Sequence, residues 1–565
     1  MASEKSFDHP DVQKFLAQGC DITSLDGNVG QEESWEGEQC KKDKKCNTCP
    51  NYEDGQCDYM EEKAEWLEYL KRKVYDFHKK LGNECIDTNI YLENNGDIHS
   101  VANYAGNDTK AFSHNKDGYV NKEDYKKFLD YCKGDKSKLN EIKFGGDRKL
   151  TNPSCIYTID SVGMPKESFW LPACPSIKSA AGAADLIEDY ALALARDIPF
   201  YKWKNSKAIK YLAHYLSKLS DFWGPKKCGN VTWDCIFRGE TKGDLKGHFV
   251  SQFLYCDVIQ GAQKYDQKVY PYVPGKDYLT SYEDARKMQD GYNPATGTEA
   301  LKEKRYITTL RDGASYIHND YPGQVAQAII QFLLSIKCPI KPQPKDSKEG
   351  YFIDLAITDI YDLVFRATKL AMCAAWHQKY TQLKLRPEAY GLLVEEAKRS
   401  GCNTHGLHKD LLESPILEKC KERWGSYCLP QCYSEGSPTH PSFPSGHATW
   451  VGAVVTILKA FFDTDFEFDA YGPNKDGSAL VPLGYKVKVG DELDKVASNV
   501  GMFRNVGGIH YRSDMLGIYL GEEVAIDLLE EAADRYDYPV KFEFEKRNGE
   551  EVKIDNSKSC KKEDC

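Results

Sequence analysis

The chain has 565 residues, of which 41% are hydrophobic and 28% are charged, and its formal net charge at pH 7 is −11. The length allows two or more ordinary domains, and the composition is typical of a globular protein. Its acidic balance argues against nucleic acid or an anionic membrane surface as a partner. No apolar run of about 18 residues occurs, so we expect no membrane-spanning helix.

The cysteine content favours an oxidising compartment. Twenty cysteines are a high and even number, and reduced cytosolic enzymes rarely carry so many. Sequons at Asn107 and Asn230 agree with secretion. The segment after Met1 lacks the apolar core of a signal peptide, so we expect a secretory signal to have been removed or replaced. The expected location is extracellular or the cell wall.

Residues 1–60 are rich in glycine, aspartate and glutamate and are expected to form an irregular arm. Their clustered cysteines favour disulfides that tie the arm or clasp subunits, and a small zinc site is the alternative. Because no histidine lies close to the cluster, the disulfide interpretation is favoured. The cluster consists of Cys40, Cys46, Cys49 and Cys57. A charged helix is expected to follow over residues 60–81.

Residues 91–132 hold two near matches to a calcium-binding loop. Asparagine, aspartate and glycine occur at the offsets of an EF-hand, but the first and last ligand positions carry unusual residues. We therefore favour Asn/Asp/Gly turns, with a structural calcium ion as the alternative. The residues concerned are Ser113, Asn115, Asp117, Gly118, Val120 and Asp124.

Hydrophobic periodicity predicts a mainly α-helical protein. We expect helical bundles, arranged as two packed four-helix-bundle-like units with long disulfide-tied loops. Alternation with period two is largely confined to residues 539–545. The expected regions are an arm (1–60), a helical supporting region (61–300), a catalytic bundle (301–540) and a tail (541–565). Helices are expected at 178–196, 206–221, 247–262, 323–337, 352–379, 388–400, 445–462 and 513–536.

Two cationic segments flank a long loop region. The first runs from Trp376 through Lys379 to Arg386, and the second runs from Arg504 to His510. Arginine forms bidentate hydrogen bonds with oxyanions, and lysine adds a point charge. Between them, residues 401–440 form a loop that we expect disulfides to hold, and loops of that length are usually functional. Its cysteines are Cys402, Cys420, Cys428 and Cys432.

The stretch from His440 to Ala448 reads His-Pro-Ser-Phe-Pro-Ser-Gly-His-Ala. A proline interrupts regular structure there, and Ser445 is a good N-cap for the buried helix that follows. Ser445, Gly446 and His447 therefore lie at a first helical turn, where free N–H groups and the helix dipole favour an anion. A hydroxyl, a backbone N–H and an imidazole at one positive helix end suit phosphate or vanadate.

These three segments, in this order, resemble the signature that vanadium-dependent haloperoxidases share with type 2 acid phosphatases. They read Lys-x6-Arg-Pro, Pro-Ser-Gly-His and Arg-x5-His-x3-Asp. The resemblance is closer to algal-type bromoperoxidases, because Trp376 precedes Lys379 by three residues and His440 precedes His447 by seven. It covers about residues 300–535. The short Lys379–Arg386 spacing and Phe503 depart from most algal enzymes, which leaves the halide preference open.

The resemblance implies a vanadate cofactor, with His510 as the axial vanadium ligand. It implies that Asp514 orients this histidine, that Trp376 and His440 influence the halide, and that Asp320 supports an acid–base His447. The implied catalytic residues are His447, Lys379, Asp320 and His440. The implied vanadate-binding residues are Lys379, Arg386, Ser445, Gly446, Arg504 and His510.

The resemblance further implies hydrogen peroxide, a halide (bromide or iodide) and small organic nucleophiles as reactants, and a homodimer or higher homo-oligomer. Two other functions remain open. The first is an acid phosphatase with a phosphohistidine intermediate at His510. The second is a cysteine-rich extracellular structural or calcium-binding protein whose oxyanion site is vestigial.

Overall fold

The computed structural model describes part of the chain, and the structural statements below refer to that part. The region expected to be an arm and the helix expected at 60–81 lie almost wholly outside it, as do Cys40, Cys46 and Cys49. The described residues are 52–53, 56–57, 97, 101–158, 162–163, 166–343, 347–536 and 538–556. Among them, no helix is both long and apolar enough to cross a bilayer.

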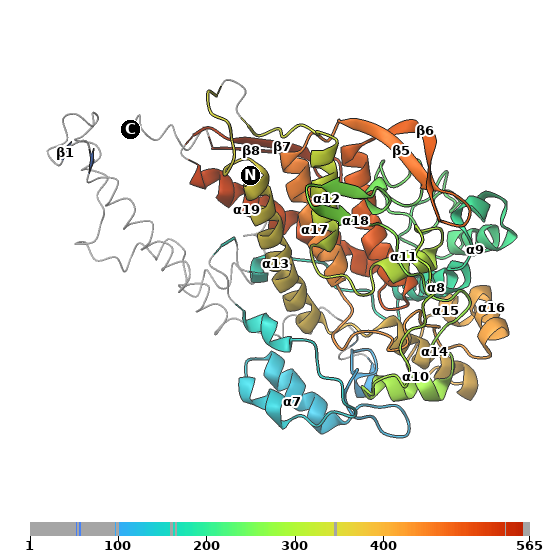
Figure 1. The fold of residues 1–565 in the computed structure, drawn as a ribbon. Helices are drawn as coiled ribbons and strands as arrows, with labels where there is room; N and C mark the ends of the chain where they lie inside the picture. Colours follow the sequence, from blue (N-terminus) through green and yellow to red (C-terminus); the bar gives the residue numbers. More distant parts are fainter. Residues whose placement is uncertain are drawn as a thin grey trace.

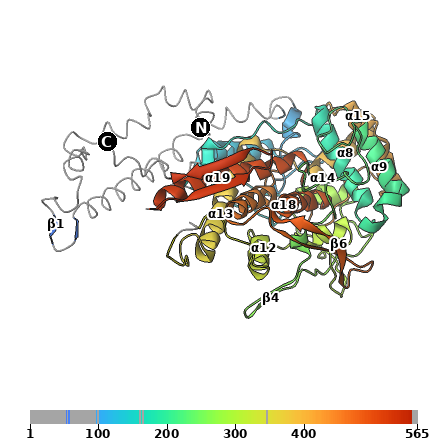
Figure 2. The ribbon, with the colours of Figure 1, turned by 90° about the horizontal axis from the view of Figure 1, so that it is seen from above.

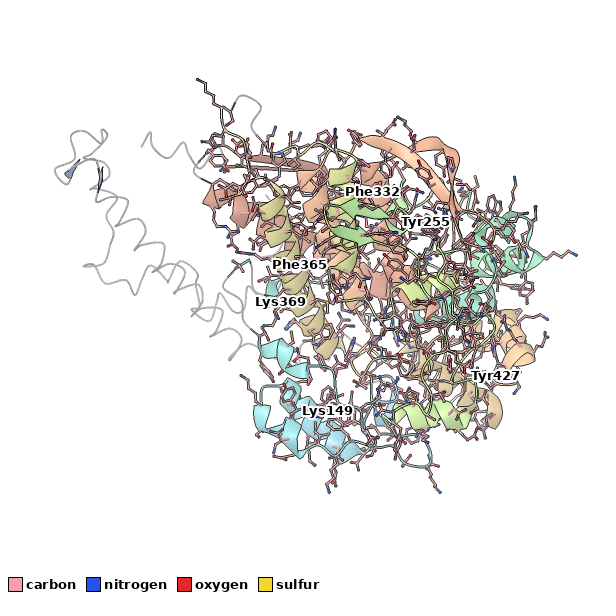
Figure 3. All side chains as sticks on the ribbon, in the orientation of Figure 1. Lys149, Tyr255, Phe332, Phe365, Lys369 and Tyr427 are labelled. Carbon is pink, nitrogen blue, oxygen red and sulfur yellow. The ribbon has the colours of Figure 1, made fainter. Side chains whose placement is uncertain are left out.

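A bundle of long helices forms the centre of the protein (Figure 1). Helix α17 packs against α12, α13, α18 and α19, and α13 also packs against α19. Seen from above, α19 runs beside α13 (Figure 2). Side chains fill the space between these helices (Figure 3). The bundle consists of α12 (Gln324–Ser335), α13 (Ile357–Gln382), α17 (Gly446–Phe461), α18 (Val489–Val506) and α19 (Gly517–Arg535).

Helix α17 is buried on all sides because its residues are almost entirely apolar or small. Trp450 and Val454 are fully buried, as expected of a helix at the centre of a core. Helix α19 approaches it through Gly521, where a Cβ would come 1.9 Å from the Thr449 carbonyl oxygen. The close contact of these two helices therefore requires glycine at this position.

We expect Gly521→Ala to destabilise the protein by about 1–3 kcal/mol, because the added methyl group would force α17 and α19 apart. The measurement is the thermal unfolding midpoint, with Glu530→Ala on the exposed face of α19 as the control. An unfolding midpoint equal to that of the wild type in Gly521→Ala would show that the contact between the helices is looser than described.

Shorter helices surround the bundle, and α8, α9, α15 and α16 lie on the side away from α19 (Figure 1). Ser179 and Ser206 cap α8 and α9 with their hydroxyl groups. These helices are α8 (Ala180–Ala195), α9 (Lys207–Ser217), α10 (Tyr282–Gln289), α11 (Leu310–Tyr316), α14 (Pro387–Ser400), α15 (Lys409–Leu412) and α16 (Pro415–Trp424). The mainly helical architecture and the helices predicted at 178–196, 206–221, 323–337, 352–379, 388–400, 445–462 and 513–536 are confirmed.

Helix α7 (Lys122–Cys132) belongs to a smaller core that packs against the C-terminal half of α13. The preceding residues form the predicted turns. Asn115 accepts from the N–H groups of Asp117 and Tyr119, each at 3.0 Å. The Asp124 carboxylate accepts from Lys127 Nζ at 2.9 Å. No group of three or more acidic, histidine or cysteine side chains in the described residues is arranged to hold a metal ion.

Strands occur only as two-stranded antiparallel hairpins in the described residues. The alternation at 539–545 correctly predicted β7, and both β7 and β8 lie in the segment 541–565 that was expected to be a tail. The hairpins are β1 (Tyr52–Glu53) with β2 (Gln56–Cys57), β3 (Val258–Gln260) with β4 (Gln263–Tyr265), β5 (Glu467–Pro473) with β6 (Leu480–Lys488), and β7 (Lys541–Glu545) with β8 (Glu551–Asp555).

The helix predicted at 247–262 is wrong. The segment forms one 3-10 turn, η8 (Gln252–Leu254), and then the hairpin β3–β4, which projects from the body of the protein (Figure 2). Side chains of α18 accept hydrogen bonds from backbone N–H groups of this segment that would be part of the helix. Asn499 accepts from the Ser251 N–H and Glu492 accepts from the Gln252 N–H, each at 2.7 Å.

In the part of the chain that the structure describes, the disulfides expected in the loop at 401–440 do not form, and part of that loop is helical (α15 and α16). Its four cysteines are among twelve free thiols between Cys132 and Cys432. Hydrogen bonds hold the loop instead. Gln431 exchanges backbone hydrogen bonds of 2.9 Å with Tyr278, and Arg196 donates to the Pro430 carbonyl at 3.0 Å.

Candidate active site

The N-terminus of α17 lies at the centre of the site. Ser445 is the N-cap, and its hydroxyl accepts from the Ala448 N–H at 3.3 Å. Gly446 and His447 follow in the first turn, where helical geometry leaves N–H groups without an intrahelical acceptor. A Cβ on Gly446 would meet the Trp376 ring at 3.2 Å, so glycine allows a close approach here. The segment presents a positive helix end.

Lys379 reaches this region from the last turn of α13, and its side chain is fully buried. Its Nζ donates to the carbonyls of Pro441 at 2.9 Å and Ser442 at 2.8 Å. These two bonds fix the ammonium against the loop that precedes α17. Burial and the nearby Arg386 hold the pKa of Lys379 well below its ordinary value, and a bound anion would offset that penalty.

Arg386 is the N-cap residue of α14, followed by Pro387 at the first helical position. Its buried guanidinium joins two parts of the site. Nε donates to the His440 carbonyl at 2.8 Å, and Nη1 donates to the Ile509 carbonyl at 2.7 Å. Nη1 also lies 3.0 Å from Nε2 of His510. Burial lowers the pKa of Arg386 to about 10.

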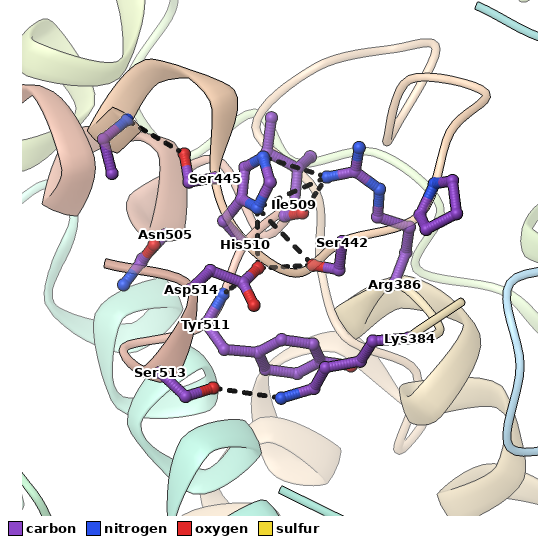
Figure 4. A network of polar contacts seen from close by, with 12 residues as sticks. Lys384, Arg386, Ser442, Ser445, Asn505, Ile509, His510, Tyr511, Ser513 and Asp514 are labelled. Atoms are coloured by element: carbon purple, nitrogen blue, oxygen red, sulfur yellow. Dashed lines mark hydrogen bonds and ion pairs between the residues drawn. The ribbon is translucent and has the colours of Figure 1, made fainter. Parts of the chain in front are cut away.

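His510 lies in the loop after α18, and a carboxylate orients its ring (Figure 4). Nδ1 lies 2.6 Å from Oδ2 of Asp514, which also accepts from the Ser442 hydroxyl. With Nδ1–H donating to Asp514, Nε2 keeps its lone pair on the side of Arg386. Burial, followed by Arg386 and Lys379, holds the pKa of His510 well below its ordinary value. The imidazole is therefore neutral and available as a ligand.

Arg504 enters from the last turn of α18. Its Nη1 donates to the Ile317 carbonyl at 3.0 Å, and its guanidinium lies 5.8 Å from the centroid of the Tyr433 ring. Its Nε is buried and has no hydrogen-bond partner among the described residues. The carbonyl and the ring hold the arginine in place while one donor stays unsatisfied.

His447 is paired with Asp320, whose carboxylate is fully buried. Nε2 of His447 lies 2.9 Å from Oδ1 of Asp320. Burial lowers the pKa of His447, and Asp320 partly offsets this effect. This arrangement leaves Nδ1 as the ring nitrogen that is available for proton exchange.

Trp376 and His440 form one wall of the site. Their rings lie 4.8 Å apart at 38°, and Trp376 Nε1 donates to the Thr151 carbonyl at 3.1 Å. Nδ1 of His440 lies 2.9 Å from Nη2 of Arg386. Burial and Arg386 hold the pKa of His440 well below its ordinary value, so this wall is a neutral aromatic pair.

The structure thus brings together every site residue that the sequence analysis singled out. Lys379, Arg386 and Arg504 are buried, and none has a carboxylate within ion-pair distance among the described residues. Buried cations without paired carboxylates are costly. The arrangement therefore favours an oxyanion, which the helix end and these three donors would bind.

Other contributors to the site were not identified from the sequence. Ser442 supports Asp514, Tyr433 supports Arg504, and the Ile317 and Thr151 carbonyls fix Arg504 and Trp376. Ser442 could have been suspected because it lies between His440 and Ser445. The two carbonyls could not, since any residue supplies the same group.

We expect Asp514→Asn to weaken oxyanion binding by about 10–100-fold, because an amide no longer fixes the His510 tautomer as the carboxylate does. The affinity is measurable by titrating vanadate against the change in intrinsic fluorescence. Asp410→Asn, which affects a carboxylate bonded to Ser220 far from the site, is the control. A vanadate affinity unchanged in Asp514→Asn would mean that the carboxylate does not orient the ring.

Comparisons with known proteins agree with this geometry. The family described as the VCPO second helical-bundle domain matches residues 361–537. A vanadium-dependent bromoperoxidase of Corallina officinalis is 29% identical over 477 residues, covering 72% of this chain and 80% of that protein. Another from Ascophyllum nodosum is 28% identical over 495 residues, covering 82% and 88%.

A solved structure extends the likeness to the fold. The homohexameric structure of the second vanadate-dependent bromoperoxidase from Ascophyllum nodosum matches with a TM-score of 0.79. The match covers 87% of this chain and 90% of that chain at 24% sequence identity. The two proteins share their fold over most of their length.

Proposed function

Because this chain belongs to the vanadium haloperoxidase family, we propose that it oxidises bromide or iodide with hydrogen peroxide, using vanadate as its cofactor. The product is a hypohalous species that halogenates small organic nucleophiles. The observation that carries this proposal is that three buried cations lie around one neutral histidine, and that none of the three forms an ion pair with a carboxylate of the described residues.

The residues present fit vanadate, a compact oxyanion. Lys379, Arg386 and Arg504 would neutralise its charge, with Ser445 and the Gly446 N–H completing the set of donors. The unsatisfied Nε of Arg504 is one donor that such an anion would use. Nε2 of His510 would be the vanadium ligand. When bound, vanadate supplies Lewis-acid activation of peroxide without a change of oxidation state.

His447 is the proposed acid–base residue. Asp320 holds its Nε2, so Nδ1 exchanges protons with the reacting peroxide. Asp320 also limits the orientations of the ring, which keeps Nδ1 in one place.

Trp376 and His440 are the proposed halide-side residues. A neutral imidazole against an indole offers a polarizable, weakly polar surface of the kind that suits a large halide. We expect His440→Ala to change the ratio of bromide to iodide turnover more than it changes vanadate affinity. Steady-state rates with each halide, alongside vanadate titration, check this. Unchanged halide ratios would make His440 a packing residue only.

The decisive experiment is bromination of monochlorodimedone with peroxide, with and without added vanadate. We expect no activity in the vanadate-free protein and full activity on reconstitution. The alternative, an acid phosphatase with a phosphohistidine at His510, predicts hydrolysis of a generic phosphomonoester and inhibition by vanadate. Bromination that does not depend on vanadate would contradict the proposal. The absence of both bromination and phosphomonoester hydrolysis would indicate a vestigial site.

We further propose that the protein is secreted and forms homo-oligomers. Asn230 supports secretion, because it lies in an exposed turn where a glycan could be attached. Asn107 is buried, so the first sequon is not usable in the folded protein. The likeness to a homohexamer supports self-association. Size-exclusion chromatography with light scattering tests the subunit number.

A further inference from the structure

Two cysteines outside the proposed active site lie side by side. Cys155 belongs to the 3-10 turn η5 (Pro153–Tyr157), and Cys373 belongs to α13. Their Sγ atoms are 3.9 Å apart, although the residues are 218 positions apart in the chain. Both are buried, with exposed fractions of 6% and 4%. Fold contacts alone therefore bring these thiols together.

The surroundings of this pair are electropositive. Lys369 lies one turn before Cys373 on α13 (labelled in Figure 3), and Lys166 is the second nearby cation. A hydrogen bond from Cys373, together with these lysines, lowers the pKa of Cys155 to about 6. The hydrogen bond to Cys155 and burial raise the pKa of Cys373. The two thiols are therefore unequal, and Cys155 is the more acidic of the two.

We propose that Cys155 and Cys373 form a peroxide-reactive dithiol, which a hydroperoxide closes to a disulfide. The Cys155 thiolate attacks one peroxide oxygen, which gives a sulfenic acid and releases hydroxide. The Cys373 sulfur then displaces the sulfenic oxygen as water, forming the S–S bond. In total, two thiols lose two electrons and two protons, and one hydrogen peroxide becomes two waters.

Closing the bond requires the sulfurs to approach to about 2 Å from their present separation. The cross-link would join the core around α7 to α13, which carries Trp376 and Lys379. The segment that carries Cys155 is already joined to α13 at Thr151, whose carbonyl accepts from Trp376 and Tyr380. Oxidation would therefore stiffen the wall of the proposed active site in the presence of its co-substrate.

The test uses the full chain, reduced with dithiothreitol, desalted, and treated with hydrogen peroxide without vanadate or halide. Remaining thiols are alkylated, and the digest is analysed by mass spectrometry. We expect a peptide pair linking Cys155 to Cys373, with the loss of two hydrogen atoms, that disappears on reduction. Cys174, a buried thiol whose pKa burial raises to about 12, is the internal control and should stay alkylatable.

Two variants test the order of the reaction. In Cys373→Ser, peroxide should leave a sulfenic acid on Cys155 that dimedone traps, and in Cys155→Ser no adduct should form on Cys373. The wild type, but neither variant, should gain a higher unfolding midpoint on oxidation. Alkylation of Cys155 after peroxide treatment to the extent seen for Cys174 would overturn the proposal. Because no vanadate is present, failure here is separate from failure of the haloperoxidase assignment.

Discussion

We expect His510→Ala to lose vanadate, with an affinity reduced by more than about 100-fold. Loss of a residue that only supports a metal ligand costs about 10–100-fold, and His510 is the proposed ligand itself. Its ring is neutral, held by Asp514 at Nδ1, and faces Arg386 through Nε2. Alanine removes this imidazole and with it the proposed ligand atom. Vanadium content after equilibrium dialysis, measured by elemental mass spectrometry, gives the affinity.

Two comparisons make the His510 result interpretable. The thermal unfolding midpoint of His510→Ala shows whether the buried site remains folded after losing the ring. His405→Ala, which removes another buried histidine, one that faces Glu396, controls for the loss of a histidine as such. Retention of vanadate by His510→Ala at the affinity of the wild type would remove His510 from the site.

We expect His447→Ala to retain vanadate but to lose about 10²–10⁴-fold in kcat, which is the usual contribution of a positioned acid–base group. Lys379, Arg386, Arg504 and His510 all stay in place in this variant, so binding is preserved. Bromination kinetics at saturating peroxide, together with vanadium content, separate the two effects. Asp320→Asn should show a smaller loss of kcat, because the ring remains but is held less firmly.

The pH profile provides a second test of His447. In the wild type, the profile of kcat should contain the ionisation of this histidine, whose pKa burial lowers. In His447→Ala this ionisation should be missing from the pH profile of kcat. Equal kcat values in variant and wild type would contradict an acid–base role, and parallel loss of vanadate would assign His447 to binding instead.

Much of the site was readable from the sequence because its chemistry depends on local patterns. Ser445 could be predicted as an N-cap, together with the first helical turn after it, because a proline, a hydroxyl residue and an apolar helix follow one another there. Lys379 and Arg386 were identified through the resemblance to the three-segment family signature, and the structure places them around the loop that precedes α17. Asp320 also lies where the sequence analysis expected it, beside His447.

Other features depend on contacts between distant parts of the chain, and they could not be predicted. The sequence predicts a helix at 247–262, yet Glu492 and Asn499 of α18 accept hydrogen bonds from its backbone N–H groups, and the segment forms a 3-10 turn and a hairpin instead. Tyr433 lies 71 positions before Arg504 in the sequence, and it supports the arginine through the face of its ring. The free thiols at 401–440 show that cysteine counts do not specify pairing.

The central claim is that the helix end at Ser445, the three cations and His510 enclose one oxyanion. The most direct measurement is a crystal structure of the protein soaked in vanadate, with the vanadium located by anomalous scattering. We predict a single vanadium position bonded to Nε2 of His510, with Lys379, Arg386 and Arg504 donating to its oxygens. Vanadium bound elsewhere, or none at this position at saturating vanadate, would contradict the account.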